Sequence, residues 1–346
     1  MVQAAGLVVT LLLGIQLARF LGPVGYGIYG LVLAMVSIVV VPGQFGLPLL
    51  AIRDTARASA DSSLDMTDLI RWYATRSVII AMAVSIALAV VLLAVEPAWL
   101  RGREVLVALA GATTFAFSIL AVSTAMLRGI GHNVLGQGID KLLKPAVVVG
   151  AILLAYVGLG RLNISQALLA QIGAALACVA LTVGLLLRHA PRSPSRSQPH
   201  KPGKWTGVAA SFMANSSLGA INGAYPMIIA GIFVSGADLG SFRVALASAA
   251  LLGLPSSIAN IAAAPIVARH SAEGDKTALA TALSHTTLVS FSLTSVAFVL
   301  LVLFGRYFIN LLFGGEYGDA HAPLIVLGLG QLTIAAFGVA GTYFNL

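Results

Sequence analysis

Apolar runs of about 20 residues recur from one end of this chain to the other, separated by short stretches that hold most of the charged residues. A helical run of that length spans the hydrocarbon core of a bilayer. Only 9% of the residues are charged, against about 25% in an ordinary soluble protein. The sequence therefore predicts an all-α, polytopic membrane protein with about ten transmembrane helices, near residues 2–20, 27–52, 72–95, 104–127, 134–157, 164–187, 206–234, 240–268, 277–304 and 321–345.

The first two runs form a predicted helical hairpin within residues 16–57. Tyr26 and Tyr29 lie beside its turn, and amphipathic rings of this kind are typical of the water–lipid boundary. The second helix of the hairpin is interrupted by glycine and proline, which in a membrane indicates backbone that faces protein or a water-filled cavity. The turn residues are Gly22, Pro23, Gly25 and Gly27, and the interrupting residues are Pro42, Gly43, Gly46 and Pro48.

The distribution of basic residues predicts the orientation of the chain. Fourteen of the 20 lysines and arginines fall in loops after even-numbered predicted helices, and six fall after odd-numbered ones. Because cytoplasmic loops carry the excess of basic residues, the N-terminus and the even loops are expected in the cytoplasm. The same rule accounts for the net charge of +8, and we expect no nucleic-acid partner.

Residues 188–204 predict a boundary between two domains. This segment holds four prolines, five basic residues and no acid, a composition typical of a flexible cytoplasmic linker. Alternatively it is a polybasic strip that rests on anionic lipid headgroups. It separates an N-terminal six-helix lobe, residues 1–187, from a C-terminal lobe, residues 205–346.

A weak internal repeat supports the two lobes. At an offset of 213 residues, Gly27 aligns with Gly240 and Pro42 aligns with Pro255, so that a proline falls inside both the second and the eighth predicted helix. Transporters built from two such repeats bind their substrate near the membrane midplane. The alignment gives the second lobe four of an expected six helices. We therefore expect the chain to be a fragment, with a groove of small or polar side chains on the incomplete lobe.

Sequence motifs of enzymes are absent from the chain. It contains no H-E-x-x-H, P-loop or G-x-S-x-G sequence, and no predicted helix carries a pair of acids. The single cysteine, Cys178, lies within an apolar run and has no disulfide partner. We expect no enzymatic activity, no catalytic residue, no cofactor and no metal.

The hairpin resembles a known family. LARFLGPVGYGIYGL followed by QFGLPLLAIRDTAR is similar to the first hairpin of the Wzx-type polysaccharide-unit (O-antigen or exopolysaccharide) flippases of the multidrug/oligosaccharidyl-lipid/polysaccharide exporter superfamily. The resemblance implies a multi-pass protein of the cell inner (plasma) membrane that flips lipid-linked oligosaccharide units by alternating access. The matching residues are Ala18, Arg19, Leu21, Gly22, Pro23, Gly27, Tyr29, Gly46, Leu47 and Arg53.

The substrate that this resemblance implies, a polyprenyl-diphosphate oligosaccharide, carries its charge where lipid and sugar join. Arginine suits phosphate oxygens because its planar fork donates two parallel hydrogen bonds. Basic residues near helix ends are therefore candidates for substrate binding: Arg19, Arg53, Arg128, Lys141 and Lys144. The alternative for each is a side chain that extends to the nearest headgroups.

Polar residues inside the predicted helices are further candidates. Asn215 and Asn222 lie seven residues apart, on one helix face. They line a path for sugar, or they join helices through hydrogen bonds. Asp140 and His285 are candidates for coupling transport to an ion or proton, and the alternative for His285 is a hydrogen-bonded structural role.

Three alternatives to a flippase stay open. A cation-coupled multidrug extruder would require an acid in its cavity. A membrane-bound glycan-modifying transferase would require a histidine or a pair of acids at one membrane face. A non-transporting scaffold of a polysaccharide assembly complex would require neither. The partners expected for the flippase are the lipid-linked oligosaccharide, membrane lipids, a polysaccharide polymerase and assembly proteins.

Overall fold

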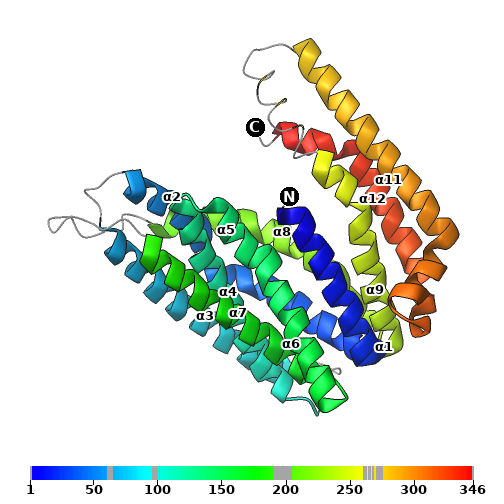
Figure 1. Cartoon of the computed structure of the whole chain (residues 1–346), viewed down its shortest axis with the longest axis horizontal. Helices are drawn as coiled ribbons and strands as arrows, with labels where there is room; N and C mark the ends of the chain where they lie inside the picture. The colour runs from blue at the N-terminus through cyan, green and yellow to red at the C-terminus, as the bar shows by residue number, and fades with distance from the viewer. Residues whose placement is uncertain are drawn as a thin grey trace. The chain divides into compact units, whose positions relative to one another are not determined.

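The computed structural model describes residues 2–60, 65–95, 100, 102–189, 205–259 and 276–344, with 263, 266 and 269 as isolated positions. The described residues form helices joined by short connections (Figure 1), as predicted. The helices are α1 (Val2–Gln44), α2 (Leu47–Ala60), α3 (Met66–Val95), α4 (Val105–Gly129), α5 (Asn133–Gly138), the π-helical η1 (Ile139–Leu143), α6 (Lys144–Leu159), α7 (Ile164–His189), α8 (Trp205–Phe233), α9 (Ala237–Leu252), α11 (Lys276–Leu312), the 3₁₀ helix η2 (Gly315–Ala320) and α12 (His321–Phe344).

Nine helical segments within the described ranges are long and apolar enough to cross a membrane. One of them, Ala5–Gln44, has 40 residues, which is about 60 Å of helix and about twice the thickness of the hydrocarbon core. Its backbone is non-helical at Gly22, with φ 68° and ψ 174°. The ribbon of α1 changes direction in this part of the helix (Figure 1). The nine segments therefore contain the ten predicted crossings, two of them within α1.

Contacts between α1 and α6 show that these two helices run parallel. Gln16 of α1 donates a hydrogen bond to the carbonyl of Val149 over 3.3 Å. Further along both helices, the Phe20 ring stacks on Tyr156 with the ring centres 3.9 Å apart. The first and fifth predicted crossings run in one direction only if the chain reverses an even number of times between them, as it does when each of the four connections is a reversal. The contacts thus support a reversal at Gly22.

Helix α4 is the centre of the first compact unit, which comprises Met1–Leu21 and Ile28–Ser235. Helices α2, α3 and α7 pack against it. Thr113, Thr114 and Ser118 of α4 are fully buried, and each hydroxyl donates to the carbonyl four residues earlier over 2.7–2.9 Å. Small and hydroxyl-bearing residues allow helices to approach closely in a membrane, where no hydrophobic effect drives their association.

The predicted interruption of the second crossing is confirmed at Phe45 and Gly46. Both have positive φ angles, 45° and 68°, so α1 ends and α2 begins there. Pro48 is tolerated because it occupies the first turn of α2, where its missing N–H has no helical partner to lose. Gly46 also packs against the start of α8, because a Cβ at this position would overlap the carbonyl oxygen of Ala209. The turn at Gly46 thus lies directly against the backbone of α8.

The second compact unit comprises Gly22–Gly27 and Gly236–Leu346. In it, α12 packs against α9 and α11, and η2 contacts all three helices. Gly27 lies against Gly240 of α9, where a Cβ on Gly27 would come within 2.7 Å of the Gly240 nitrogen. Pro255, the counterpart of Pro42, lies in the helical stretch 254–259, directly after a turn at Gly253 that ends α9.

The expectation that Tyr26 and Tyr29 lie at the water–lipid boundary is wrong. Each side chain is only 2% exposed. Tyr26 meets Tyr317 edge to face with ring centres 6.5 Å apart, and the Tyr29 hydroxyl accepts a hydrogen bond from Gln171 over 2.8 Å. A tyrosine ring packs inside a protein as readily as at a headgroup layer once its hydroxyl has a partner.

Other predicted boundaries differ in detail. The helix predicted over 277–304 continues to Leu312, because Arg306 is exposed on the helix surface and does not end it. Most of the predicted linker, residues 190–204, lies outside the described residues. The two predicted lobes with a boundary at 188–204 stay a prediction.

Candidate substrate-binding site

The fifth crossing contains a turn of π-helix, and its sequence explains why. Pro145 has no N–H to donate to the carbonyl of Lys141, four residues earlier, and its ring crowds that carbonyl. The chain responds by widening to π geometry over Ile139–Leu143 before α6 continues. The carbonyl of Lys141 then faces α1, where Gly6 leaves space that a Cβ would fill. Single π turns within α-helices occur frequently at functional sites.

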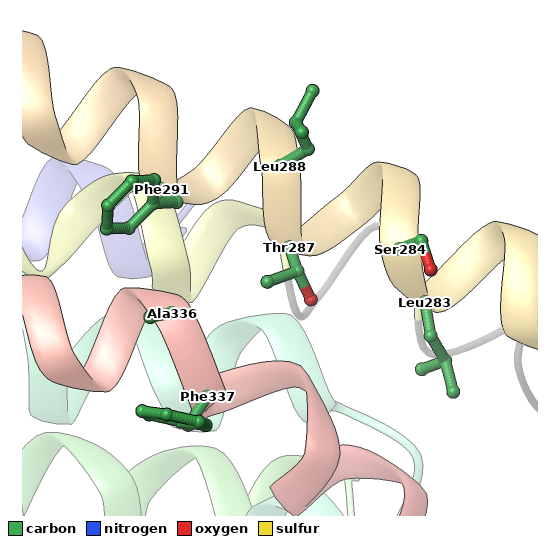
Figure 2. Close-up of a pocket in the computed structure, with 7 residues that line it drawn as sticks. All are labelled: Leu283, Ser284, Thr287, Leu288, Phe291, Ala336 and Phe337. Carbon is green, nitrogen blue, oxygen red and sulfur yellow. The ribbon is translucent and has the colours of Figure 1, made fainter.

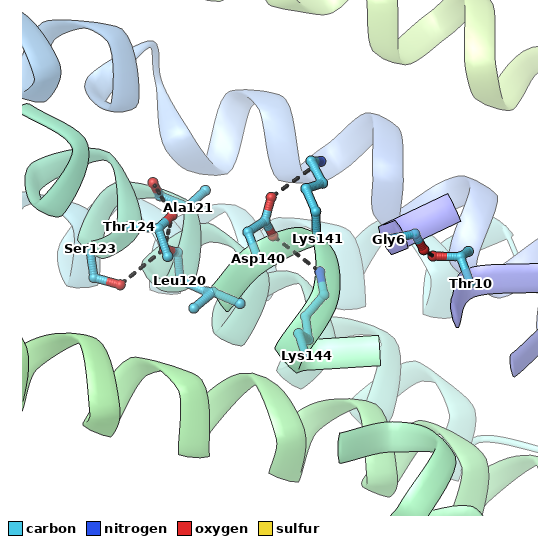
Figure 3. A network of polar contacts seen from close by, with 9 residues as sticks. All are labelled: Gly6, Thr10, Leu120, Ala121, Ser123, Thr124, Asp140, Lys141 and Lys144. Atoms are coloured by element: carbon cyan, nitrogen blue, oxygen red, sulfur yellow. Dashed lines mark hydrogen bonds and ion pairs between the residues drawn. The ribbon is translucent and has the colours of Figure 1, made fainter. Parts of the chain in front are cut away.

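The π turn brings an acid between two lysines (Figure 3). The Asp140 carboxylate pairs with Lys141 Nζ at 3.2 Å through one oxygen and with Lys144 Nζ at 3.4 Å through the other. Lys144 is 21% exposed and Lys141 is 61% exposed. Lys144 is therefore the shielded member of the pair, and Lys141 is accessible.

Lys144 has a second neighbour on α4. Its ammonium lies 4.4 Å from the centre of the Phe117 ring. A cation over an aromatic face is attracted by the negative charge of the ring face, by about 0.5–2 kcal/mol depending on desolvation. Phe117 and Asp140 together hold the ammonium in one position.

Arg128, at the end of α4, completes the site. Its stem packs against Gly136 of α5, where a Cβ would come within 2.5 Å of Arg128 Cγ. Its guanidinium is close enough to Asp140 for their charges to interact. The Nε atom of Arg128 is buried and has no hydrogen-bond partner among the described residues, which is costly for a charged donor.

Arg128, Asp140, Lys141 and Lys144 are called the basic cluster below. It has three positive charges and one negative charge, and it lies about two helical turns from the start of the candidate span Asn133–Leu159. Charged groups within a span are costly and mark substrate or ion pathways. Chemically, the cluster can bind a dianion through Arg128 and the lysines. Among the described residues, no group of three or more histidine, cysteine or acidic side chains lies close enough together to hold a metal ion.

The structure places Arg53 in a different network. Its Nε atom pairs with Asp54 over 3.0 Å. The other oxygen of the same carboxylate accepts a hydrogen bond from the Tyr73 hydroxyl. Arg53 is 39% exposed, so part of its guanidinium is accessible. Its role in substrate binding stays a prediction.

The remaining predicted site residues lie apart from the basic cluster along the chain. Arg19 is exposed on α1, three residues before Gly22, and Asn215 and Asn222 are exposed on α8. His285 is exposed on α11 in the second unit. Near it, residues of α11 and α12 line an open pocket of about 530 Å³ (Figure 2). Its lining residues carry no charge, so it does not suit a phosphate: Leu283, Ser284, Thr287, Leu288, Phe291, Ala336 and Phe337.

Sequence reasoning missed three residues of the site. Phe117 is one aromatic residue in an apolar run, and its contact with Lys144 depends on tertiary packing. Gly6 and Gly136 are close-approach positions that no local pattern distinguishes from other glycines. Pro145 was the available signal, because a proline shortly after two charged residues inside a span predicts a local departure from the α-helix.

A protein family resembles this chain in sequence, and solved structures resemble it in fold. The sequence model of a family described as "Polysaccharide biosynthesis protein" matches residues 1–271. No curated protein matches the chain by sequence. Among solved structures, the fold is similar to an inward-facing multidrug resistance MATE family transporter of the MOP superfamily, with a TM-score of 0.73 and 17% identity over 98% of this chain and 82% of that chain. It is also similar to the lipid II flippase MurJ in an inward closed conformation, with a TM-score of 0.66 and 11% identity over 98% of this chain and 74% of that chain.

Proposed function

Because the chain belongs to the polysaccharide biosynthesis protein family, we propose that it is a flippase that moves lipid-linked oligosaccharide or polysaccharide units across the cell inner membrane by alternating access. The fold is that of MATE and MurJ transporters. MurJ is named as a flippase of lipid II, and a lipid-linked sugar is the substrate class that we propose here.

The observation that carries the proposal is the basic cluster, which the fifth crossing and the end of α4 form together. A polyprenyl-diphosphate oligosaccharide presents two phosphates at the join of lipid and sugar. Arg128 has a buried Nε that no described residue hydrogen-bonds, and phosphate oxygens are strong acceptors for such a donor. The cluster keeps two positive charges after Asp140 is counted, which matches the charge of a diphosphate.

The pairing of Asp140 favours the flippase over a cation-coupled multidrug extruder. An acid that binds a coupling cation needs free carboxylate oxygens, whereas both oxygens of Asp140 already bind lysines. In our proposal Asp140 orients Lys141 and Lys144 toward the diphosphate. Its role as a coupling residue stays the alternative.

The two asparagines of α8 support a path for the sugar. Asn215 and Asn222 are exposed in a helix whose length and composition suit a membrane crossing. An amide exposed to hydrocarbon is unfavourable. We therefore expect water or polar groups along the face of α8 that carries the two asparagines. We propose that this face contacts the sugar while the prenyl tail stays in lipid.

Export of the glycan by variants of the cluster tests the proposal. Arg128→Ala and Lys144→Ala should each reduce export by about ten- to a hundredfold, because a hydrogen bond to a charged group contributes about 1.5–3 kcal/mol. Arg128→Lys should restore it only in part, since the bidentate fork is lost. Arg161→Ala removes an exposed arginine between α6 and α7 and is the matched control.

Export is measured in cells that lack the native flippase, at equal abundance of each variant in the membrane. Binding of a short-chain polyprenyl diphosphate to the purified chain is measured in parallel. Normal export and binding by both alanine variants would exclude the basic cluster as the phosphate site. Drug efflux without glycan export would favour the extruder.

A further inference from the structure

Two histidines at the ends of separate helices contact each other outside the basic cluster. His132 is in the turn between α4 and α5, and His189 is the last residue of α7. Their rings are 4.7 Å apart, centre to centre, and tilted by 56°. The two residues are far apart in the chain, so only the packing of these helices brings the rings together.

The ring of His189 is oriented by its own helix. Its Nδ1 atom lies 3.0 Å from the carbonyl oxygen of Leu185. Because a carbonyl only accepts, Nδ1 is the donor in this contact, and in the neutral tautomer Nε2 is the nitrogen available to a metal ion. Histidines that bind metals almost always donate their second ring nitrogen to a carbonyl or carboxylate in this way.

His132 supplies the second nitrogen. Its Nδ1 atom is buried and has no hydrogen-bond partner within the described part of the chain. A buried polar atom without a partner is destabilising, and an ion or a proton donor would relieve that cost. The backbone of His132 begins α5, but its side chain makes no capping hydrogen bond, so helix capping does not explain the ring position.

We propose that His132 and His189 form a binding site for a transition-metal dication of the copper, nickel and zinc class. Two nitrogens bound to one ion lie at most about 4 Å apart, since each metal–nitrogen bond is about 2.0–2.1 Å. Ring centres 4.7 Å apart allow one nitrogen of each ring to come within this limit. His189 is exposed, so water can reach the ion from the side of this ring and complete its coordination.

A bound ion would connect the turn before α5 to the end of α7. It would therefore hold the start of the crossing that carries Asp140, Lys141 and Lys144. The sequence predicted no metal site, because two isolated histidines match no ligand spacing. The inference is independent of the proposed transport function.

Metal binding to the full-length purified chain tests the site. The affinity tag must contain no histidine. One ion per chain is expected, with Cu²⁺ bound more tightly than Ni²⁺ or Zn²⁺, and Mg²⁺ and Ca²⁺ should not compete, because imidazole prefers the softer ions. Isothermal titration measures the affinity, and the rise of the melting temperature with ion concentration provides a second measurement.

His132→Ala and His189→Ala should each lower the affinity at least tenfold, since even residues that only support metal ligands contribute about 10–100-fold. Each single variant should fall to the level of the double variant, because one imidazole alone cannot chelate. His285→Ala removes an exposed histidine of α11 and is the matched control. His132→Gln and His189→Gln replace the alanine variants if those do not fold. Wild-type affinity in either single variant, or loss of binding in His285→Ala, would overturn the proposal.

Discussion

The Tyr73 hydroxyl donates a 2.7 Å hydrogen bond to Asp54, the residue whose carboxylate also pairs with Arg53. Tyr73 is fully buried on α3, whereas Arg53 and Asp54 belong to α2. The interaction joins these two helices and gives the arginine a partner inside the protein. Two roles of Arg53, one structural and one in substrate binding, can therefore be separated by experiment.

Arg53→Ala should lower the free energy of unfolding by at most about 1 kcal/mol, because partly exposed ion pairs contribute little. If Arg53 also binds phosphate, the same variant should lose glycan export at normal abundance, and Arg53→Lys should restore export only in part. Melting temperature and export are measured on the same preparations. Full export by Arg53→Ala would confine Arg53 to the network with Asp54 and Tyr73.

Phe117→Leu should weaken substrate binding by about two- to thirtyfold, the equivalent of about 0.5–2 kcal/mol, because the leucine keeps the apolar contact but loses the attraction to Lys144. Phe117→Tyr should bind nearly as well as the native chain. Phe115→Leu changes another half-buried ring of α4 and is the control. Affinity for a polyprenyl diphosphate is the measurement, and equal affinities for the Phe117→Leu and Phe115→Leu variants would refute the role of the ring.

Gly6→Ala should destabilise the chain by about 1–3 kcal/mol, because the added Cβ overlaps the carbonyl of Lys141 and α1 must move away from the π turn. Gly150→Ala on α6 is the matched change, since a Cβ there meets nothing within 4 Å. It should be neutral or stabilising by up to about 1 kcal/mol. Thermal unfolding in detergent distinguishes the two, and equal melting temperatures would contradict the close approach.

Ser195→Cys tests the predicted orientation. An impermeant thiol reagent should fail to label this variant in intact cells and should label it in broken membranes, because the 188–204 segment is expected in the cytoplasm. The native Cys178 is only 1% exposed and gives little background. Ready labelling from outside would reverse the orientation of every loop.

Long apolar runs made most of the fold predictable. The helices predicted at 164–187 and 206–234 differ from α7 and α8 by two residues at most, because hydropathy alone determines which residues lie in a bilayer. The predictions for Tyr26 and Tyr29 were wrong for a related reason. The sequence shows that a tyrosine ring is amphipathic. It does not show whether the hydroxyl will form a hydrogen bond with a residue such as Gln171 or with a lipid headgroup.

The candidate site was predictable in part. Their positions near helix ends made Arg128, Lys141 and Lys144 candidates, and Asp140 was a candidate as a polar residue inside a predicted helix. The pairing of both lysines with one acid depends on the π turn, and the contact with Phe117 depends on how α4 packs. The contact of His132 with His189 had no sequence signal, because neither helix end indicates its neighbour.

The π turn also determines the rotational phase of the two helices that it joins. It accommodates one residue more than an α-helical turn, so α5 is rotated by about 100° relative to its position in an uninterrupted helix. Deleting one residue from 139–143 would leave the hydropathy of the crossing almost unchanged. It would nevertheless rotate His132 and Gly136 away from α7 and α4. The number of residues in 139–143 therefore determines whether His132 faces α7 and Gly136 faces α4. A hydropathy profile does not contain this information.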